Sequence, residues 1–374
     1  MSQEPNLFTP PHASNEWLEQ FLIPSLVAAS PYKIDTTTTP VKLDQNENPW
    51  DWPENLKDKI VTGLRRLPWN RYPSAYSDDL ADLVGIQAGL TNGCVLLGPG
   101  SNYLVALVMS TFSRQNKGKM VVARPSFALY ESHCAYDGIQ VHPWNLDVNM
   151  QYDTSLLPEL TEGSMVVFAS PNNPVGNVLP YKTLEALATR HPDVLFVADE
   201  AYLEYSKEPY TPLLKDHANI LLIRTFSKTL GAAGIRMGCV LGAPKLIEQL
   251  RKIRLPYMVN LFGLVAARMV LEDIETQKHF KGIVAKGIAE RDRVFVALQA
   301  IALKKGFQVI PSEANFLLLK WPNQSDCDKA YRHILEQGIL IRDVSKGPGL
   351  AGCLRVTIGT TEQNNLFLAA TQSS

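Results

Sequence analysis

The feature that most constrains the fold is an alternation of short apolar runs with amphipathic stretches between about residues 77 and 275. Each apolar run is rich in Val, Ile, Leu or Ala and is bounded by turn residues, which is typical of strands buried on both faces of a sheet. Strands that alternate with helices predict a mostly parallel sheet with crossover helices. The expected strands are 94–97, 120–123, 165–169, 195–198, 220–223 and 237–241.

After about residue 276 the pattern changes. A long charged helix is expected to about residue 305, followed by closely spaced strands and helices that predict a smaller α+β domain. We therefore expect an α/β protein with three parts: residues 1–60 as an N-terminal arm and part of the small domain, 61–275 as the large domain, and 276–374 as the small C-terminal domain. Residues 1–15 are expected to form a loose arm.

Charge and cysteine content disfavour several classes of function. The 374-residue chain has a formal net charge of −1, which gives no electrostatic reason to expect nucleic acid or an anionic membrane as a partner. Its five cysteines are scattered, which argues against a disulfide framework and a structural zinc site. We expect neither a signal peptide nor a membrane-spanning helix. We expect a cytoplasmic enzyme for small molecules, with free, mostly buried thiols and no metal.

Two loops that follow expected strands can contact a ligand, because ligands of open α/β sheets bind beyond the carboxyl ends of the strands. Residues 98–102 read Gly-Pro-Gly-Ser-Asn and precede an apolar stretch. Ser101 can cap that helix, whose N-terminus favours an anion such as phosphate, although an ordinary strand–turn–helix junction has the same pattern. Residues 170–176 read Ser-Pro-Asn-Asn-Pro-Val-Gly, and here Asn173 can offer an amide to a ligand.

Two further loops carry ionisable groups. Asp199 ends a buried strand and needs a partner there; a cationic ring nitrogen would be one, while a salt bridge or a helix cap is the simpler explanation. Lys228 follows the next strand, and a lysine in a partly buried, electropositive pocket has a lowered pKa and can attack a carbonyl. Thr225, Ser227 and Arg236 surround it in sequence and can hold a phosphate.

Other enzyme classes lack their signatures. The chain contains no G-x-S-x-G elbow, no H-E-x-x-H metal motif and no G-x-x-x-x-G-K-[ST] phosphate loop. The glycines at 231, 234 and 238 do not follow a strand with the spacing of a nicotinamide-binding fold.

The combined pattern resembles the aspartate-aminotransferase-type enzymes that use pyridoxal phosphate (PLP), and most closely the histidinol-phosphate aminotransferases. The resemblance rests on Asn-Asn-Pro-x-Gly, on Asp-Glu-Ala-Tyr, and on Ser-Lys with an arginine eight residues after the lysine. Supporting segments lie at 42–49, 71–73, 224–238, 314–316 and 348–359. The resemblance implies the fold type I architecture, with a large domain built on a mostly parallel sheet and a smaller α+β domain.

The resemblance also implies roles for particular residues. Lys228 forms a Schiff base with the cofactor, Asp199 pairs with its ring nitrogen, and Phe127 stacks on its ring. Tyr202 and Asn173 bond the ring 3′-oxygen. The phosphate is held by Ser101, Asn102, Thr225, Ser227 and Arg236. The implied substrate contacts are Arg355, Arg342 and Asn48. Tyr72 reaches the cofactor phosphate of a neighbouring subunit, so a homodimer with shared active sites is implied.

The implied activity is amino transfer between histidinol phosphate and 2-oxoglutarate in histidine biosynthesis, with a small-molecule amino donor and a keto acceptor. An aromatic amino acid aminotransferase and a threonine-phosphate decarboxylase share these motifs. A non-catalytic PLP-binding regulator usually carries a fused DNA-binding segment, and residues 1–40 are too short and too weakly basic for one. Two departures from the family pattern are Asn102-Tyr103 in the first loop and Met258 near the expected active-site entrance.

Overall fold

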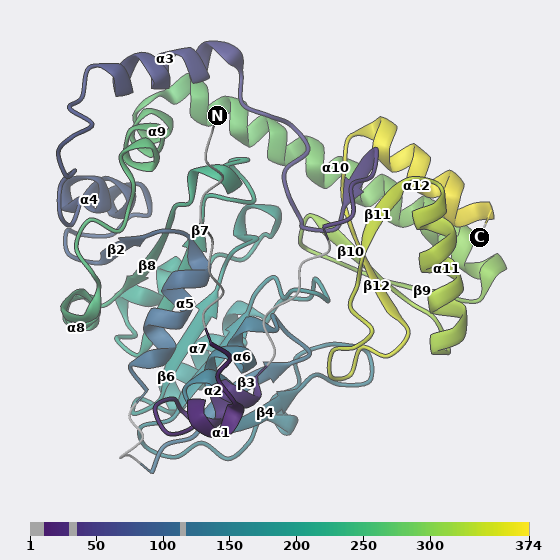
Figure 1. The fold of residues 1–374 in the computed structure, drawn as a ribbon, viewed down its shortest axis with the longest axis horizontal. Helices are drawn as coiled ribbons and strands as arrows, with labels where there is room; N and C mark the ends of the chain where they lie inside the picture. Colours follow the sequence, from purple (N-terminus) through teal and green to yellow (C-terminus); the bar gives the residue numbers. More distant parts are fainter. Residues whose placement is uncertain (1–10, 30–35, 113–116, 374) are drawn as a thin grey trace.

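The computed structural model describes residues 11–29, 36–112 and 117–373. Two sheets organise these residues (Figure 1). The larger sheet has the strand order β2-β8-β7-β6-β5-β3-β4, and the smaller has the order β1-β11-β12-β10-β9. The two-sheet α/β architecture expected from the sequence is confirmed.

The larger sheet is mostly parallel, as predicted. Strands β7, β6, β5, β3 and β4 run parallel to one another, and β8 runs antiparallel to its neighbours β7 and β2. Strand β4 was not predicted from the sequence, because this edge strand includes His142, Pro143 and Asn145 and so lacks a continuous apolar run. The strands are β2 Val95–Gly98, β3 Met120–Arg124, β4 Val141–Asn145, β5 Met165–Ala169, β6 Leu195–Asp199, β7 Ile220–Thr225 and β8 Gly238–Gly242.

The smaller sheet joins the two ends of the chain. Strand β1 pairs in parallel with β11, about 300 residues later, and the other pairs in this sheet are antiparallel. The segment after β1 is thereby brought beside strands β11 and β12. The strands are β1 Val41–Leu43, β9 Gln308–Ile310, β10 Phe316–Lys320, β11 Ile339–Asp343 and β12 Cys353–Thr357.

Helices cover both faces of the larger sheet. Alternate side chains of β5 enter two separate hydrophobic cores, with Val166 and Phe168 in one and Val167 and Ala169 in the other. The first core is closed by α3 Glu54–Arg65, α4 Asp78–Gln87, α7 Tyr181–Arg190 and α9 Leu261–Glu272. The second is closed by α5 Ser101–Ser110, α6 Leu129–Tyr136 and α8 Pro244–Ile253. Because both faces of the sheet are covered, polar loops can gather at the carboxyl ends of the parallel strands.

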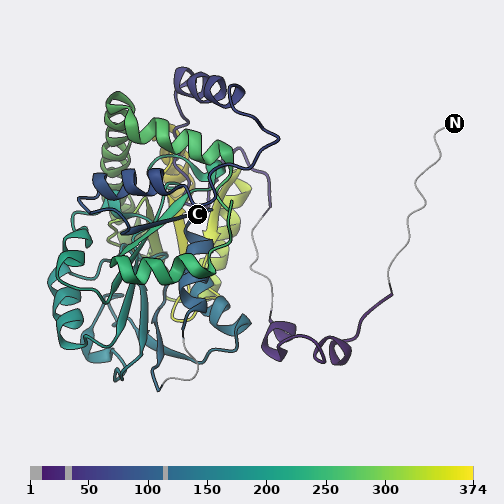
Figure 2. The ribbon, with the colours of Figure 1, turned by 90° about the vertical axis from the view of Figure 1, so that its left-hand side faces the viewer.

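Helix α10, Ile274–Lys305, contacts α9, which packs on the larger sheet, and also contacts β9, β10 and α12 at the smaller sheet. It crosses the boundary expected at residue 275, so the division at 60 and 275 stays a prediction. Helices α11 Gln324–Glu336 and α12 Thr361–Ser373 cover the smaller sheet. Figure 2 shows α1 Asn15–Leu18 and α2 Pro24–Ala28 at the edge of the body, where α2 contacts α6; of the expected loose arm, residues 1–10 lie outside the described residues.

All five cysteines are free and buried, as the sequence analysis predicts. Within the part of the chain that the structure describes, no helix combines the length and apolar character needed to span a bilayer.

Candidate active site

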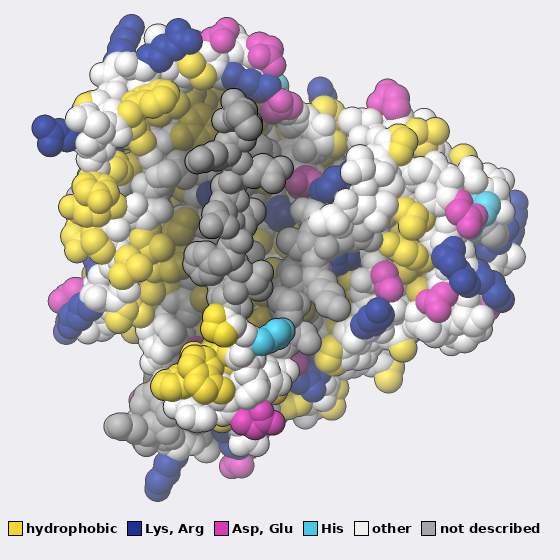
Figure 3. All heavy atoms as spheres, viewed as in Figure 1, with side chains coloured by type: hydrophobic (Ala, Val, Ile, Leu, Met, Phe, Trp, Pro, Cys, Tyr) yellow, Lys and Arg dark blue, Asp and Glu magenta, His cyan; other side chains and the backbone are white. Residues whose placement is uncertain are grey.

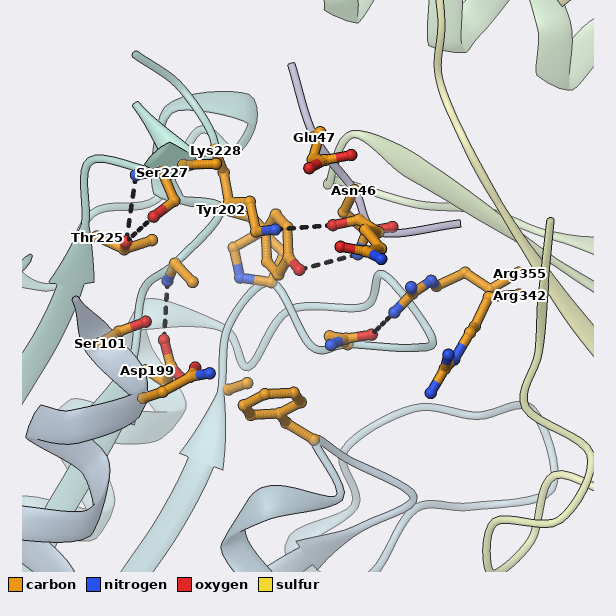
Figure 4. A pocket seen from close by; sticks show the side chains of 18 of the residues that line it. Asn46, Glu47, Ser101, Asp199, Tyr202, Thr225, Ser227, Lys228, Arg342 and Arg355 are labelled. Atoms are coloured by element: carbon orange, nitrogen blue, oxygen red, sulfur yellow. Dashed lines mark hydrogen bonds between the residues drawn. The ribbon is translucent and has the colours of Figure 1, made fainter. Parts of the chain in front are cut away.

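A cavity of about 490 Å³ lies where the loops after the parallel strands face the smaller sheet (Figure 4). Twelve of the fourteen residues that the sequence singles out line it. They are Ser101, Asn102, Phe127, Asn173, Asp199, Tyr202, Thr225, Ser227, Lys228, Arg236, Arg342 and Arg355. The cavity therefore collects side chains from five loops of the larger sheet and two strands of the smaller one.

One corner of the cavity can hold an anion. Gly100 has a φ of 88°, which favours glycine, and a Cβ at this position would lie 2.7 Å from Nη2 of Arg236. Glycine therefore lets the guanidinium approach the start of α5. The expectation that Ser101 caps this helix is wrong, because Gly100 occupies the cap position and Ser101 is the first helical residue. The backbone N–H groups at this end of α5 still favour a negative charge.

Hydroxyl groups complete this corner. Thr225 is the last residue of β7, and its hydroxyl donates to Oγ of Ser227 at 2.9 Å. The same Thr225 oxygen accepts the backbone N–H of Ser227 at 3.2 Å. Two hydroxyls, a guanidinium and a helix N-terminus are a donor set suited to a phosphate group.

Asp199 lies at the buried end of β6 and faces the cavity (Figure 4). Its Oδ2 accepts the hydroxyl of Tyr130 at 2.8 Å, and its Oδ1 accepts the N–H of Ala201 at 3.0 Å. Burial raises the pKa of Asp199 to about 6, although these two hydrogen bonds oppose the rise. A cationic nitrogen placed in the cavity would stabilise a buried carboxylate of this kind.

Lys228 follows β7, and its Nζ donates to the backbone oxygen of Gln45 at 2.8 Å. Burial, and next the positive charge of Arg355, lower the pKa of Lys228 to about 8. A larger share of the amine is therefore neutral near pH 7 than for an exposed lysine. A neutral amine is the form that attacks a carbonyl carbon.

The smaller sheet contributes two arginines. Arg342 on β11 and Arg355 on β12 are directly paired across the antiparallel strands. Arg355 donates to Oδ1 of Asn173, and its Nη2 donates to the backbone oxygen of Asp44 at 2.6 Å. Like charges on opposed positions destabilise a sheet, so an anion bound between the two guanidinium groups would stabilise this wall.

Three further side chains from the loops of the larger sheet, Phe127, Asn173 and Tyr202, line the cavity. The hydroxyl oxygen of Tyr202 accepts Nδ2 of Asn46 at 2.9 Å. Because the amide oxygen of Asn173 accepts from Arg355, its NH₂ group is the end left for another acceptor. Phe127 lines the cavity and meets Tyr130 edge to face, with ring centroids 5.6 Å apart.

Two of the fourteen residues do not line the cavity. Nδ2 of Asn48 donates to the backbone oxygen of Thr229 at 3.1 Å, which ties the segment after β1 to the loop that carries Lys228. Tyr72 is 80% exposed and stacks on Tyr257, with ring centroids 4.4 Å apart.

Sequence reasoning missed other residues that line the cavity. Tyr130 gave no signal, because an aromatic residue in a helix is usually part of the core. The polar run of residues 44–48 was a signal, since Asp44, Gln45, Asn46 and Glu47 all line the cavity. In the sequence, this run supports the family resemblance, and Asn48 alone was predicted from it as a site residue.

The fold and this cavity define a class of protein. Residues 38–370 match the family described as aminotransferase class I and II, so the chain belongs to that family. Its cofactor is pyridoxal 5′-phosphate.

Proteins similar to this chain carry names more specific than that of the family. Histidinol-phosphate aminotransferase of Ruminiclostridium cellulolyticum is 31% identical over 358 residues, which cover 94% of this chain and 97% of that protein. The histidinol-phosphate aminotransferase of Sinorhizobium meliloti, solved in complex with pyridoxal-5′-phosphate, has a TM-score of 0.77 at 22% identity and covers 99% of this chain and 98% of its own. The L-threonine-O-3-phosphate decarboxylase of Porphyromonas gingivalis has a TM-score of 0.73 at 24% identity, with coverages of 89% and 98%.

The residues present fit this cofactor. The donor set around Gly100 suits its phosphate, and the buried carboxylate of Asp199 suits its ring nitrogen. Lys228, with its lowered pKa, suits its aldehyde. These three groups line one cavity, as a single cofactor with three functional groups requires.

Proposed function

We propose that this aminotransferase exchanges an amino group between histidinol phosphate and 2-oxoglutarate, forming imidazole-acetol phosphate and glutamate. The observation that carries the proposal is the pair of opposed arginines, Arg342 and Arg355, in the same cavity as the cofactor residues. Two fixed positive charges suit a substrate with a phosphate and, in the other half-reaction, one with two carboxylates. Relatives that carry the name histidinol-phosphate aminotransferase support the same substrate.

The cofactor would be held at three points. Lys228 would bind its aldehyde covalently, and Asp199 would pair with its ring nitrogen. Tyr202 and Asn173 would donate to the ring 3′-oxygen, while Phe127 would stack on the ring. The phosphate would be held by Ser101, Asn102, Thr225, Ser227 and Arg236. When bound, the cofactor withdraws electrons from the substrate's Cα, and this weakens the Cα–H bond.

Lys228 would also move the proton. Once freed by the substrate amine, Nζ of Lys228 would be an amine within the same cavity. It would take the proton from the substrate's Cα as a base and then return a proton as an acid. Because the pKa of Lys228 is about 8, the amine can serve both roles near neutral pH.

The substrate would be oriented from the smaller sheet. Arg355 would bind a substrate carboxylate through its planar fork, and Arg342 would bind the anionic tail. Asn48 was expected to touch the substrate, but its amide donates to Thr229, so it would act on the substrate only by fixing this segment.

A second copy of the chain would complete the enzyme. Large hydrophobic side chains are exposed at Leu67, Trp69, Tyr72, Tyr76, Leu255, Tyr257 and Phe262. Figure 3 shows hydrophobic side chains gathered over the region of α4, α8 and α9. An exposed apolar surface of this kind is typical of a subunit interface. In a two-fold dimer Tyr72 would reach the phosphate of the partner's cofactor.

The test is a substrate panel. The purified enzyme is mixed with glutamate and, separately, imidazole-acetol phosphate, phenylpyruvate or 4-hydroxyphenylpyruvate, and the products are identified. We expect rapid formation of histidinol phosphate. In the reverse direction histidinol phosphate should react far faster than histidinol, because the analogue leaves a buried charged site without its partner. A preference for the aromatic keto acids, or release of carbon dioxide from threonine phosphate, would assign the enzyme to one of those two activities instead.

A further inference from the structure

Asn46 is a buried residue in the segment that links β1 to α3. It is 1% exposed and has a φ of 53°, in the left-handed region. Each of its four polar groups has a partner. Its N–H donates to Oγ1 of Thr357 at 2.9 Å, and its backbone oxygen accepts Nδ2 of Asn315 at 3.0 Å. Its side-chain oxygen lies 3.1 Å from Oγ1 of Thr357, and its Nδ2 donates to the hydroxyl of Tyr202 at 2.9 Å.

The contacts with Thr357 set the direction of this amide. Oγ1 of Thr357 accepts the backbone N–H of Asn46 and turns its own hydrogen toward Oδ1 of the same residue. The NH₂ group of Asn46 therefore faces Tyr202. A tyrosine hydroxyl has one hydrogen to donate and can accept through its lone pairs. Because Asn46 donates to that oxygen, the hydroxyl hydrogen of Tyr202 is not donated to Asn46.

We infer that Asn46 is a positioning residue that directs the hydroxyl hydrogen of Tyr202 toward the 3′-oxygen of the cofactor. The inference rests on the proposed role of Tyr202. Figure 4 shows Asn46 and Tyr202 pointing toward each other, with Lys228 beside them. A donor that is itself held by a neighbouring amide loses less freedom when it bonds the cofactor.

Residue type matters at this position for two reasons. Asparagine is tolerated in the left-handed region, where most side chains are strained. Its amide also supplies a donor, which neither glycine nor an ionised aspartate can offer. Asn46→Gly therefore removes the donor and keeps the backbone, whereas Asn46→Asp replaces the donor by an acceptor that takes the hydrogen of Tyr202.

The smaller sheet fixes the position of Asn46 through its contacts with Thr357 and Asn315. Thr357 is the last residue of β12, two positions after Arg355, and Asn315 immediately precedes β10. Both are buried. Tyr202 belongs to the loop after β6 of the larger sheet. Asn46 thus fixes a cofactor-facing hydroxyl of one wall from the strands of the other.

The experiment measures the pH midpoint of the visible absorption of the bound cofactor, together with the affinity for the cofactor. A hydrogen donated to the 3′-oxygen weakens the hold of that oxygen on the proton shared with the neighbouring nitrogen, so losing the donation raises the midpoint. We expect Tyr202→Phe and Asn46→Asp each to raise it by about one pH unit, the size of one hydrogen bond to a charged group. Asn46→Gly should raise it by less, because the Tyr202 hydroxyl is then unguided rather than redirected.

A double substitution separates guidance from charge. In the Tyr202→Phe background Asn46→Asp should shift the midpoint much less than in the wild type, because no hydroxyl remains to redirect. Equal shifts in both backgrounds, or an unshifted midpoint in Asn46→Asp alone, would overturn the inference. An unshifted midpoint in Tyr202→Phe would overturn the proposed role of Tyr202 and this inference with it. Asn323→Asp, at the start of α11, is the matched control and should leave the midpoint unchanged.

Discussion

The two walls of the cavity use different chemistry. The larger sheet presents Asp199 and Lys228, whose pKa values burial moves to about 6 and about 8. The smaller sheet presents Arg342 and Arg355, whose guanidinium groups keep their charge. One wall therefore tunes reactivity through protonation, and the other fixes an anion through permanent charge. Substitutions on the first wall should affect every substrate, whereas those on the second should separate one substrate from another.

The largest effect is expected on the wall that carries Asp199 and Lys228, here called the reactive wall. Lys228→Ala removes both the covalent link and the group that moves the proton, and loss of the latter alone typically costs about 10²–10⁴-fold in rate. Turnover should fall at least this far for glutamate and histidinol phosphate alike. Borohydride should fix the cofactor to Lys228 in the wild type. Lys245→Ala, at an exposed position of α8, is the control. A label on another lysine would contradict the assignment.

Asp199→Asn should have the next largest effect. Losing a charged contact to the ring nitrogen should slow turnover by roughly 10–10³-fold, again for all substrates. The strength of this contact depends on pH, because Asp199 of the cofactor-free enzyme becomes protonated as the pH falls through about 6. Wild-type affinity for the cofactor should therefore weaken below pH 6 more steeply than that of Asp199→Asn, as equilibrium titrations of the apoenzyme can measure. Parallel pH profiles, or near-normal turnover, would refute the pairing.

On the wall that carries Arg342 and Arg355, here called the substrate wall, the effect should be smaller and selective. Arg342→Met removes one fixed charge, so kcat/KM for histidinol phosphate should fall about 10–100-fold, the cost of about 1.5–3 kcal/mol for a hydrogen bond to a charged group. The midpoint of the cofactor absorption should stay unchanged. Equal losses for histidinol and histidinol phosphate would show that Arg342 does not recognise the phosphate, and the distinction between the walls would fail.

The smallest effect is expected for Tyr72. Its substitution tests whether the partner subunit contributes a residue to the cofactor site. Tyr72→Phe should weaken cofactor affinity only a few-fold, as expected for one hydrogen bond. When it is unfolded and refolded with an equal amount of Lys228→Ala, about one site in four should be fully intact, because each mixed two-fold dimer has one intact site. Activity at limiting cofactor would then exceed the average of the two parents. Activity equal to that average would place Tyr72 in its own subunit's site.

Much of the reactive wall could be read from the sequence. Strands buried on both faces are continuous apolar runs, so β5, β6 and β7 could be found and the loops after them searched. Asp199 and Lys228 each lie within a few residues of such a strand end. Parallel strands bring their carboxyl ends to one edge, and the sequence therefore predicted that these loops meet.

Several contacts of the cavity were harder to predict from the sequence. Asn46 and Thr357 are 311 residues apart, and the pairing of β1 with β11 that brings their segments together leaves no local pattern. Tyr130 looks like an ordinary core aromatic until the fold places its hydroxyl against Asp199. The prediction that Ser101 caps α5 was wrong for a local reason, because Gly100, with a positive φ, occupies the cap position.

The sequence by itself determined the α/β class, the order of the loops and the chemical types of the cofactor-facing groups, because each depends on residues close together in the chain. Only the tertiary structure decided which way the amide of Asn46 faces, and only it set the arginines of β11 and β12 opposite each other. Burial of Asp199 and Lys228, and with it their shifted pKa values, was likewise decided there. The physical reason is that desolvation and hydrogen-bond direction depend on every neighbour in space, and most of those neighbours are distant in sequence.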